Sequence, residues 1–193
     1  EDLSSLVDDI KEGAVRTIEI VKGLRVFSRL DEEDMKDANI NECLDATLVL
    51  LKNKTKNSIK ITKKYDDELP EILCYPGQLN QVFMNIINNA IQAMPEDKEN
   101  AEITVATEKT KEGINIRLKD NGSGMSDEVK QRIFEPFFTT KPVGVGTGLG
   151  MSISYGIIEK HHGQLHVESE LGVGTEFIIE LPKAVGQILS EAS

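Results

Sequence analysis

The sequence contains few of the residues that characterise several common classes of protein. It has no tryptophan, and aromatic residues make up only 5% of its 193 residues. The two cysteines, Cys43 and Cys74, are not spaced as in a metal or redox site, so we expect both to be buried, reduced thiols. No apolar run is long enough to cross a bilayer. The chain is therefore not expected to be a zinc-binding, disulfide-rich or membrane-spanning protein.

Basic residues are also scarce. The chain has 22 Lys and Arg against 33 Asp and Glu, which gives a formal net charge of -11. A surface that binds nucleic acid needs clustered Lys and Arg to neutralise the phosphates. Nucleic acid is therefore not expected as a partner.

The remaining composition is that of a soluble globular protein, with 39% hydrophobic and 28% charged residues. Glu1 is not followed by a basic and apolar leader, which indicates that the chain is part of a longer protein. We expect a cytoplasmic location. The residues leave open whether the parent protein is anchored in a membrane.

An amphipathic segment opens the chain at residues 1–34. Its apolar residues follow a heptad pattern and are Leu3, Leu6, Ile10, Ile20, Leu24 and Phe27. The pattern predicts a helix of a bundle. A single amphipathic helix cannot bury its apolar face alone, so we expect a homodimer formed through this helix. A charged run follows and predicts a hinge at residues 35–37, before a folded domain at 38–183 and a tail at 184–193.

The folded domain shows alternating helix and strand patterns. Asn41 is placed to cap a first helix that ends near Asn57. Further helices are predicted at 76–94, 127–134 and 149–162, and strands at 59–65, 102–107, 113–119, 164–169 and 175–181. Helices and strands alternate too loosely for strict βαβ units. We therefore predict an α+β fold, a two-layer α/β sandwich whose mixed, mostly antiparallel sheet carries helices on one face.

The helix predicted at 76–94 has two different faces. One face is apolar and is predicted core, whereas the other carries uncharged amides at Gln81, Asn85, Asn88, Asn89 and Gln92. Exposed helix faces usually carry Lys and Glu, and Asn is a mediocre helix former, so these amides need buried partners or a ligand. Amide oxygens suit Mg²⁺ that also binds nucleotide phosphates. Side-chain caps are the alternative explanation.

The segment DNGSG, from Asp120 to Gly124, follows a predicted strand. Its glycines allow a tight turn and close approach of the backbone to a flat ligand. A carboxylate fixed here could accept a hydrogen bond from the exocyclic amine of adenine and would repel the carbonyl of guanine. An ordinary turn is the alternative.

The segment GVGTGLG, from Gly144 to Gly150, precedes a predicted helix. Glycine backbone amides and a helix N-terminus can together bind phosphate. The segment does not match a P-loop or a dinucleotide-binding motif. Upstream, Phe134, Phe137 and Phe138 are expected either to anchor one end of a flexible lid over the nucleotide or to form an apolar plug under the glycine loop.

Together these segments resemble the catalytic domain of sensor histidine kinases, within the wider family shared by gyrase, heat-shock protein 90 and MutL. Five motifs occur in the family's order: NIINNAIQA as the N box, DNGSG as the first glycine box, FEPFFTTK as the F box, GTGLGMS as the second glycine box, and GVGTEF as the last. The resemblance covers about residues 38–183 and implies a Bergerat-type ATP-binding fold. The short lid most resembles the nitrogen-sensor-like subgroup.

The resemblance implies roles for individual residues. Asn85 and Asn89 would hold Mg²⁺, and Asp120 would read adenine. Gly122 and Gly124 would shape the adenine pocket. The other positions that the resemblance places at ATP are Gln92, Phe138, Thr139, Thr140, Lys141, Gly146, Thr147, Gly148, Leu149, Gly150 and Thr175.

Two of these positions carry open questions. Gln92 stands where some family members have a phosphate-binding Lys or Arg, which puts charge neutralisation there in doubt. Lys141 is expected either to approach the phosphates from the lid or to remain a flexible, exposed lysine.

The residue at position 85 separates two activities. In the ATP-hydrolysing relatives it is Glu, which activates water, whereas the amide of Asn85 cannot act as a general base. Phosphoryl transfer to a neutral histidine depends mainly on positioning and Mg²⁺. We therefore expect a histidine protein kinase that uses ATP, with Asn85 and Lys141 as its catalytic residues and a response regulator as its downstream partner. A nucleotide-gated interaction module and a gyrase-type ATPase are the competing hypotheses.

None of the three histidines resembles a phosphate acceptor. His161, His162 and His166 fall at a helix end and in a strand, where we expect a helix C-terminal charge or a surface side chain. His162 also replaces a glycine that is usual in the family. The N-terminal segment resembles the second helix of a dimerisation bundle, so the histidine-bearing helix is expected to precede Glu1 in the parent protein.

Overall fold

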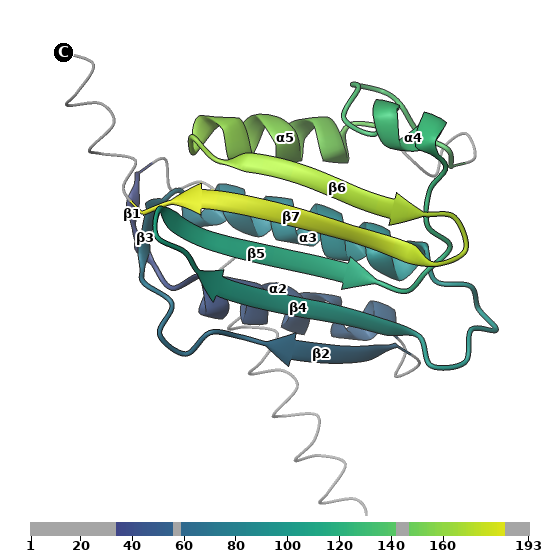
Figure 1. Ribbon diagram of the computed structural model, residues 1–193, viewed down its shortest axis with the longest axis horizontal. Coiled ribbons are helices and arrows are strands. Elements are labelled where there is room, and N and C mark those ends of the chain that lie inside the picture. Colours follow the sequence, from purple (N-terminus) through teal and green to yellow (C-terminus); the bar gives the residue numbers. More distant parts are fainter. Residues whose placement is uncertain (1–33, 56–58, 142–146, 184–193) are drawn as a thin grey trace, which may run out of the picture.

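The computed structural model describes residues 34–55, 59–141 and 147–183. Its main sheet has five strands in the order β2-β4-β5-β7-β6 (Figure 1). β2 (Lys60–Lys64) runs parallel to β4 (Glu102–Lys109). The other neighbours are antiparallel, through β5 (Gly113–Asp120), β7 (Gly174–Pro182) and β6 (Gln164–Glu170). The predicted mixed, mostly antiparallel sheet is therefore confirmed.

The helices form a second layer. α3 (Pro76–Gln92) lies at its centre and contacts both α2 (Ile40–Thr55) and α5 (Gly150–Lys160). Figure 1 shows α2 and α3 running behind the sheet. The short α4 (Asp127–Arg132) contacts β6. The helix predicted at residues 1–34 lies outside the described residues except for Asp34, and the predicted tail at 184–193 lies outside them entirely.

The core sits between α3 and the sheet. Pro76 occupies the first turn of α3, where its missing N–H costs no hydrogen bond. The apolar face predicted from the spacing is buried in full, at Leu79, Val82, Phe83, Ile86, Ile87 and Ala90. Six such side chains stabilise the domain by roughly 1.5–3 kcal/mol each, with less for Ala. The position of α3 on the sheet is fixed by this contact.

On β5 and β7 the alternating buried positions continue to the edge of the core. On β5 the buried positions recur every second residue and end at Asp120. On β7 the same pattern begins at Thr175. These two polar residues are opposite one another in the β5–β7 register. Both therefore lie on the inner face, at the end of the sheet where the apolar row stops.

A second, two-stranded sheet is absent from the sequence prediction. β1 (Lys36–Ala38) pairs antiparallel with β3 (Ile72–Cys74). Residues 36 and 37, expected to form a hinge, thus belong to a paired strand of the folded domain. Three-residue strands are too short to show a period, so their pairing could not be anticipated. Both cysteines are buried and, within the described residues, neither forms a disulfide, as expected. Burial raises the pKa of Cys74 to about 12.

The first helix is capped by a different residue than the sequence indicated. Asn39 Oδ1 accepts a hydrogen bond from the backbone N–H of Glu42, so Asn39 and not Asn41 caps α2. Asn41 instead donates to the carbonyl of Asp66 and accepts from the Thr107 hydroxyl. This side chain ties α2 to β4 and to the loop after β2.

His161 is a core residue, which corrects the expectation of a charged helix end or a surface side chain. It is 1% exposed. Its Nδ1 lies 2.7 Å from the carbonyl oxygen of Ile157, and the backbone N–H of Tyr75 donates to its Nε2 at 3.0 Å. Nε2 is thus an acceptor and Nδ1 carries the proton, as in a neutral ring. Burial lowers the pKa of His161 below its usual value. The ring joins the end of α5 to the start of α3.

The neighbouring His162, which replaces a glycine usual in the family, has an unusual backbone conformation. His162 has φ 55°, in the left-handed region that glycine adopts without strain. The family's usual glycine at this position therefore has a conformational reason.

The buried His161 predicts acid sensitivity of the fold. Because its pKa is lower in the folded than in the unfolded state, the unfolded chain binds its proton first as pH falls. The stability that this histidine contributes is present above about pH 6.5 and is lost as pH falls from there through the folded-state pKa. Urea unfolding at pH 7.5 and 5.5 should show a lower free energy of unfolding at pH 5.5. Part of that loss should disappear in His161→Gln.

The control is His166→Gln, which removes an exposed histidine from β6 and should retain the pH dependence of the wild type. If His161→Gln retained it as well, the neutral, buried state of His161 would not be the cause.

Candidate functional site

A pocket of about 440 Å³ lies between α3, the ends of β5 and β7, and the segments before and after α4. Its volume is in the range of small-molecule sites. Of the sixteen residues that the sequence assigned to ATP, thirteen line it. Gly122 and Leu149 are adjacent in sequence to lining residues but are not among them, and Gly146 lies outside the described residues.

The pocket also contains residues that the sequence did not identify. Apolar lining comes from Met125, Val129, Ile133 and Met151. Met125 directly follows the DNGSG segment, and Val129 and Ile133 lie four residues apart along α4 and its end. The i, i+4 spacing of α4 was the available signal, but which of its faces meets the pocket depends on the fold.

Asp120 is the buried carboxylate of the pocket, with 4% of its surface exposed. Its Oδ1 accepts hydrogen bonds from the backbone N–H groups of Gly122, at 2.8 Å, and Thr175, at 3.3 Å. Burial raises the pKa of Asp120, and these two hydrogen bonds oppose the rise. Both bonds go to Oδ1, so within the described residues Oδ2 is left to accept a hydrogen bond from a ligand.

The glycines of the DNGSG loop allow close backbone contacts. A side chain at Gly122 would come within 2.7 Å of the Ala93 carbonyl oxygen, at the end of α3. Gly124 has φ 64°, and a Cβ there would lie 1.9 Å from the Glu170 carbonyl oxygen. The loop is therefore pressed between α3 and the β6–β7 turn, which holds Asp120 in place.

Thr175 belongs to a hydroxyl network that includes an unpredicted residue, Ser169. The two hydroxyls are 2.9 Å apart. Ser169 Oγ also accepts from the backbone N–H of Met125 and donates to the carbonyl of Gly174. Ser169 thus joins β6, β7 and the loop after β5 behind the pocket.

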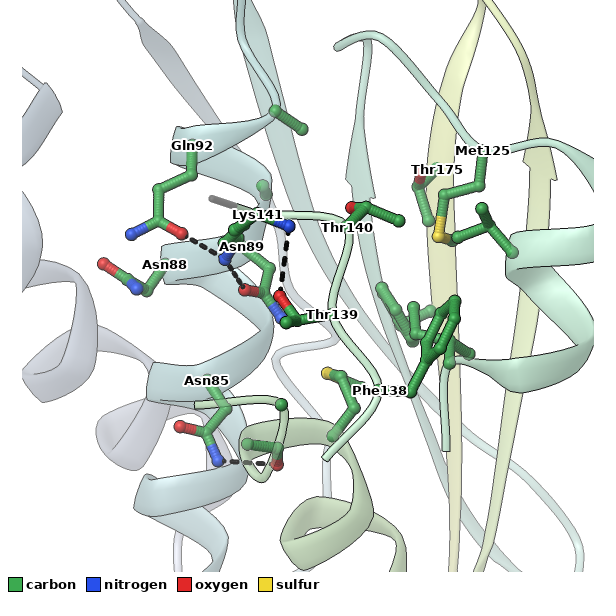
Figure 2. Close-up of a pocket in the computed structure, with 18 of the residues that line it drawn as sticks. Asn85, Asn88, Asn89, Gln92, Met125, Phe138, Thr139, Thr140, Lys141 and Thr175 are labelled. Carbon is green, nitrogen blue, oxygen red and sulfur yellow. Dashed lines mark hydrogen bonds between the residues drawn. The ribbon is translucent and has the colours of Figure 1, made fainter. Parts of the chain in front are cut away.

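Asn85 is held by α5. Its Nδ2 donates to the carbonyl oxygen of Gly150 at 3.0 Å and to Ser154 Oγ at 3.1 Å. Because a carbonyl can only accept, the amide nitrogen faces α5 and Oδ1 is on the other side of the carboxamide. Figure 2 shows Asn85 on the same helix as Asn88, Asn89 and Gln92.

Lys141 lies against the amide face of α3 and is not a free, fully exposed lysine. Its ammonium donates to Asn89 Oδ1 at 3.0 Å and to Gln92 Oε1 (Figure 2). Burial lowers the pKa of Lys141. Among the described lining residues Lys141 is the single cation. The ammonium thus lies beside Gln92, the position at which the resemblance places a positive charge in some family members.

The amide oxygens of α3 fit a magnesium ion bound together with phosphates. The described residues contain no cluster of three or more His, Cys, Asp or Glu that could hold a metal alone. Mg²⁺ prefers oxygen ligands and keeps several waters, so one or two amide oxygens suffice when phosphates supply others. Asn89 Oδ1 already accepts from a cation, the Lys141 ammonium. Asn85 and Asn89 are one turn apart on α3 and would hold the metal together.

The three phenylalanines of the lid segment differ in their packing. Phe134 packs against Tyr155, with ring centroids 5.3 Å apart. Phe138 lies under the Arg132 guanidinium, 4.3 Å from the ring centroid. Phe137 is 74% exposed, so it does not anchor the lid by burial as expected. The backbone of Phe137 instead lies close to Gly148, before α5. A Cβ added at Gly148 would lie 2.4 Å from the Phe137 carbonyl carbon.

The fold and the pocket define a class: an α+β domain with a buried carboxylate and an amide-lined helix at one ligand site. The family model described as histidine kinase-, DNA gyrase B-, and HSP90-like ATPase matches residues 74–185. The chain belongs to this family, and within it to the ATP-binding catalytic domains of sensor histidine kinases.

Individual relatives agree with this assignment. Sporulation kinase E of Bacillus subtilis is 42% identical over 149 residues, which are 76% of this chain and 20% of that protein. The sensory histidine kinase/phosphatase NtrB of Vibrio alginolyticus is 34% identical over 75% of this chain and 43% of its own length. The chain thus spans less than half the length of these two relatives.

Solved structures of one histidine kinase, ThkA, show the same fold. Its catalytic domain superposes with a TM-score of 0.69 at 31% identity, over 78% of this chain and 97% of that domain. A structure of ThkA in complex with the response regulator protein TrrA gives a TM-score of 0.64 at 28% identity, over 95% of this chain and 52% of that chain.

Two glycines make a matched test of the packing at the site. Gly124→Ala should cost at least about 1 kcal/mol from the left-handed backbone alone, and the contact with Glu170 adds to this. Gly156→Ala, in α5 with open space around its Cβ, should stabilise by about 0.5–1 kcal/mol. Urea unfolding of both variants measures the two shifts. A neutral Gly124→Ala would mean that the loop can move away from the β6–β7 turn.

Proposed function

We propose that this domain binds Mg-ATP and transfers the γ-phosphate to a histidine on a dimerisation helix of its parent protein, for relay to a response regulator. The observation that carries the proposal is that Asp120 and the amides of Asn85, Asn89 and Gln92 line one pocket. One end thus has an acceptor for adenine and the other has groups for phosphates and metal.

At the base end, Asp120 would accept a hydrogen bond from the adenine amino group through Oδ2. Its Oδ1 is already occupied by two backbone N–H groups, so the carboxylate cannot rotate freely. The apolar side chains of Met125, Val129 and Ile133 line the pocket and would cover the faces of the base. Thr175 would support the base from β7.

At the phosphate end, the side chains of α3 and the lid provide the contacts. When bound, Mg²⁺ would neutralise phosphate charge and orient the γ-phosphate. Asn85 and Asn89 would hold the metal through their oxygens, and Lys141 would neutralise phosphate charge from the lid. Gly148 and Gly150 line the pocket, so that their backbone can approach the phosphates at the start of α5.

Phosphoryl transfer is favoured over ATP hydrolysis. Asp120 is the single carboxylate among the described lining residues, and it serves the base end. Asn85 cannot remove a proton from water. A neutral histidine needs no such base, because its ring nitrogen is nucleophilic already.

The proposed partners would be bound in part by segments outside the described residues. A homodimer through residues 1–34 would present the histidine-bearing helix to this pocket. A response regulator is proposed because the similar kinase ThkA has been solved with one. None of the described helices is long and apolar enough to cross a membrane. We propose that the domain works in the cytoplasm.

Asp120→Asn tests the base end. The substitution can keep Oδ1 as acceptor for Gly122 and Thr175 but places an N–H donor where adenine also has a donor. ATP affinity should fall by about 10- to 100-fold, the effect of losing a hydrogen bond to a charged group. Preference for ATP over GTP should fall as well. Calorimetric titration of both nucleotides with Mg²⁺ measures this.

Asp127→Asn is the control, because it makes the same change on α4 at an exposed residue paired with Lys130. It should bind ATP like the wild type. No measurable ATP affinity in the wild type would contradict the proposed function itself.

Labelling with γ-labelled ATP tests the chemistry. This chain alone should bind Mg-ATP without acquiring label, because its three histidines are not acceptors. Adding a separate dimerisation bundle that carries an acceptor histidine should yield acid-labile, base-stable phosphate on that bundle. Label on this chain would contradict the assignment of the acceptor. Steady release of free phosphate without transfer would favour an ATPase, and tight binding with neither would favour an interaction module.

A further inference from the structure

Ser154 forms a triangle of hydrogen bonds with Asn85 and Gly150. It is a fully buried residue of α5, 0% exposed. Its hydroxyl donates to the Gly150 carbonyl at 2.8 Å. Asn85 Nδ2 donates to both corners of the triangle, the Gly150 carbonyl at 3.0 Å and Ser154 Oγ at 3.1 Å. Residues 69 positions apart in sequence are joined in this way.

The triangle determines which atom of Asn85 is hydrogen-bonded to α5. A carboxamide has an oxygen and a nitrogen of similar size, and only the oxygen can bind a cation. Gly150 offers Asn85 an acceptor. Ser154 also offers an acceptor, because its own proton is used on the Gly150 carbonyl. Reversal of the carboxamide would place Oδ1 against the Gly150 carbonyl, which can only accept, and Ser154 could then bond Oδ1 only by turning its proton away from that carbonyl.

We propose that Ser154 is a positioning residue for the metal, because it holds Asn85 Nδ2 against α5 and so leaves Oδ1 available to bind a cation. This inference rests on the proposed function, in which Asn85 binds Mg²⁺ held with ATP. Ser154 itself does not touch the nucleotide. Its effect passes through Asn85, and it is therefore specific to the metal-dependent part of ATP binding.

A buried serine that only bonds the carbonyl four residues earlier would stabilise or bend its helix and do nothing else. That role predicts a uniform effect on folding and on all ligand binding. The positioning role predicts an effect that depends on Mg²⁺. The two are separated by measuring ATP affinity with Mg²⁺ and with EDTA.

The test is Ser154→Ala, with calorimetric ATP titration in both conditions. The gain in affinity on adding Mg²⁺ should shrink by about fivefold, the size expected for one neutral hydrogen bond, while the affinity in EDTA stays within about twofold of the wild type. The Mg²⁺-dependent gain of Ser154→Cys should fall between those of the wild type and Ser154→Ala, since a thiol is a weaker acceptor of similar shape.

Ser152→Ala is the matched control. Its hydroxyl donates to the Leu149 carbonyl on the same helix and makes no bond to Asn85, so the Mg²⁺-dependent gain should remain that of the wild type. Thermal unfolding of all variants shows whether each is folded. An unchanged gain in Ser154→Ala, or an equal loss with Mg²⁺ and with EDTA, would overturn the positioning role. A wild type that binds ATP with no dependence on Mg²⁺ would instead overturn the metal assignment.

Discussion

The packing of α3 on the sheet is the contact on which the rest of the domain depends. One face of this helix buries its apolar side chains against the strands, and the opposite face lines the pocket with amides. A helix so fixed cannot rotate without exposing Phe83 or Ile86, which are at most 1% exposed. The hydrophobic core therefore sets the direction of Asn85 and Asn89. Their Asn identity, unfavourable for a surface helix, is tolerated because the core side of the helix supplies the stability.

The sheet positions the other end of the pocket by the same reasoning. Alternation along β5 and β7 brings Asp120 and Thr175 to the inner face where the apolar row ends. A carboxylate at such a position is desolvated, and two backbone N–H groups on one oxygen offset part of the free-energy cost. The second oxygen of Asp120 is left as a preorganised hydrogen-bond acceptor. The loop that carries Asp120 is held by glycines whose close backbone contacts would be blocked by a side chain.

How much of the structure the sequence predicts depends on how far apart in the sequence the interacting residues lie. The face of α3, the alternation of β5 and the DNGSG turn are determined by residues a few positions apart, and they were predicted. The fold class was too, because five local motifs agree with it. The β1–β3 pair, the bond from Tyr75 to His161 and the contact of Asn85 with Ser154 join residues far apart in sequence. No local period encodes such pairings. Ser154 and Ser169 look like ordinary helix and strand serines until the fold brings them to hydrogen-bond distance of the lining residues Asn85 and Thr175.

Lys141 brings the single positive charge among the described lining residues to the amide face of α3. The chain carries a net charge of -11, yet the phosphate end of the proposed site must attract a polyanion. Lys141 places its ammonium on the oxygens of Asn89 and Gln92, at the cost of partial desolvation that lowers its pKa. Under the proposed function Asn89 would offer this oxygen to the metal, and Lys141 beside it would neutralise phosphate charge. A single side chain thus joins the segment after α4 to the amide face of α3.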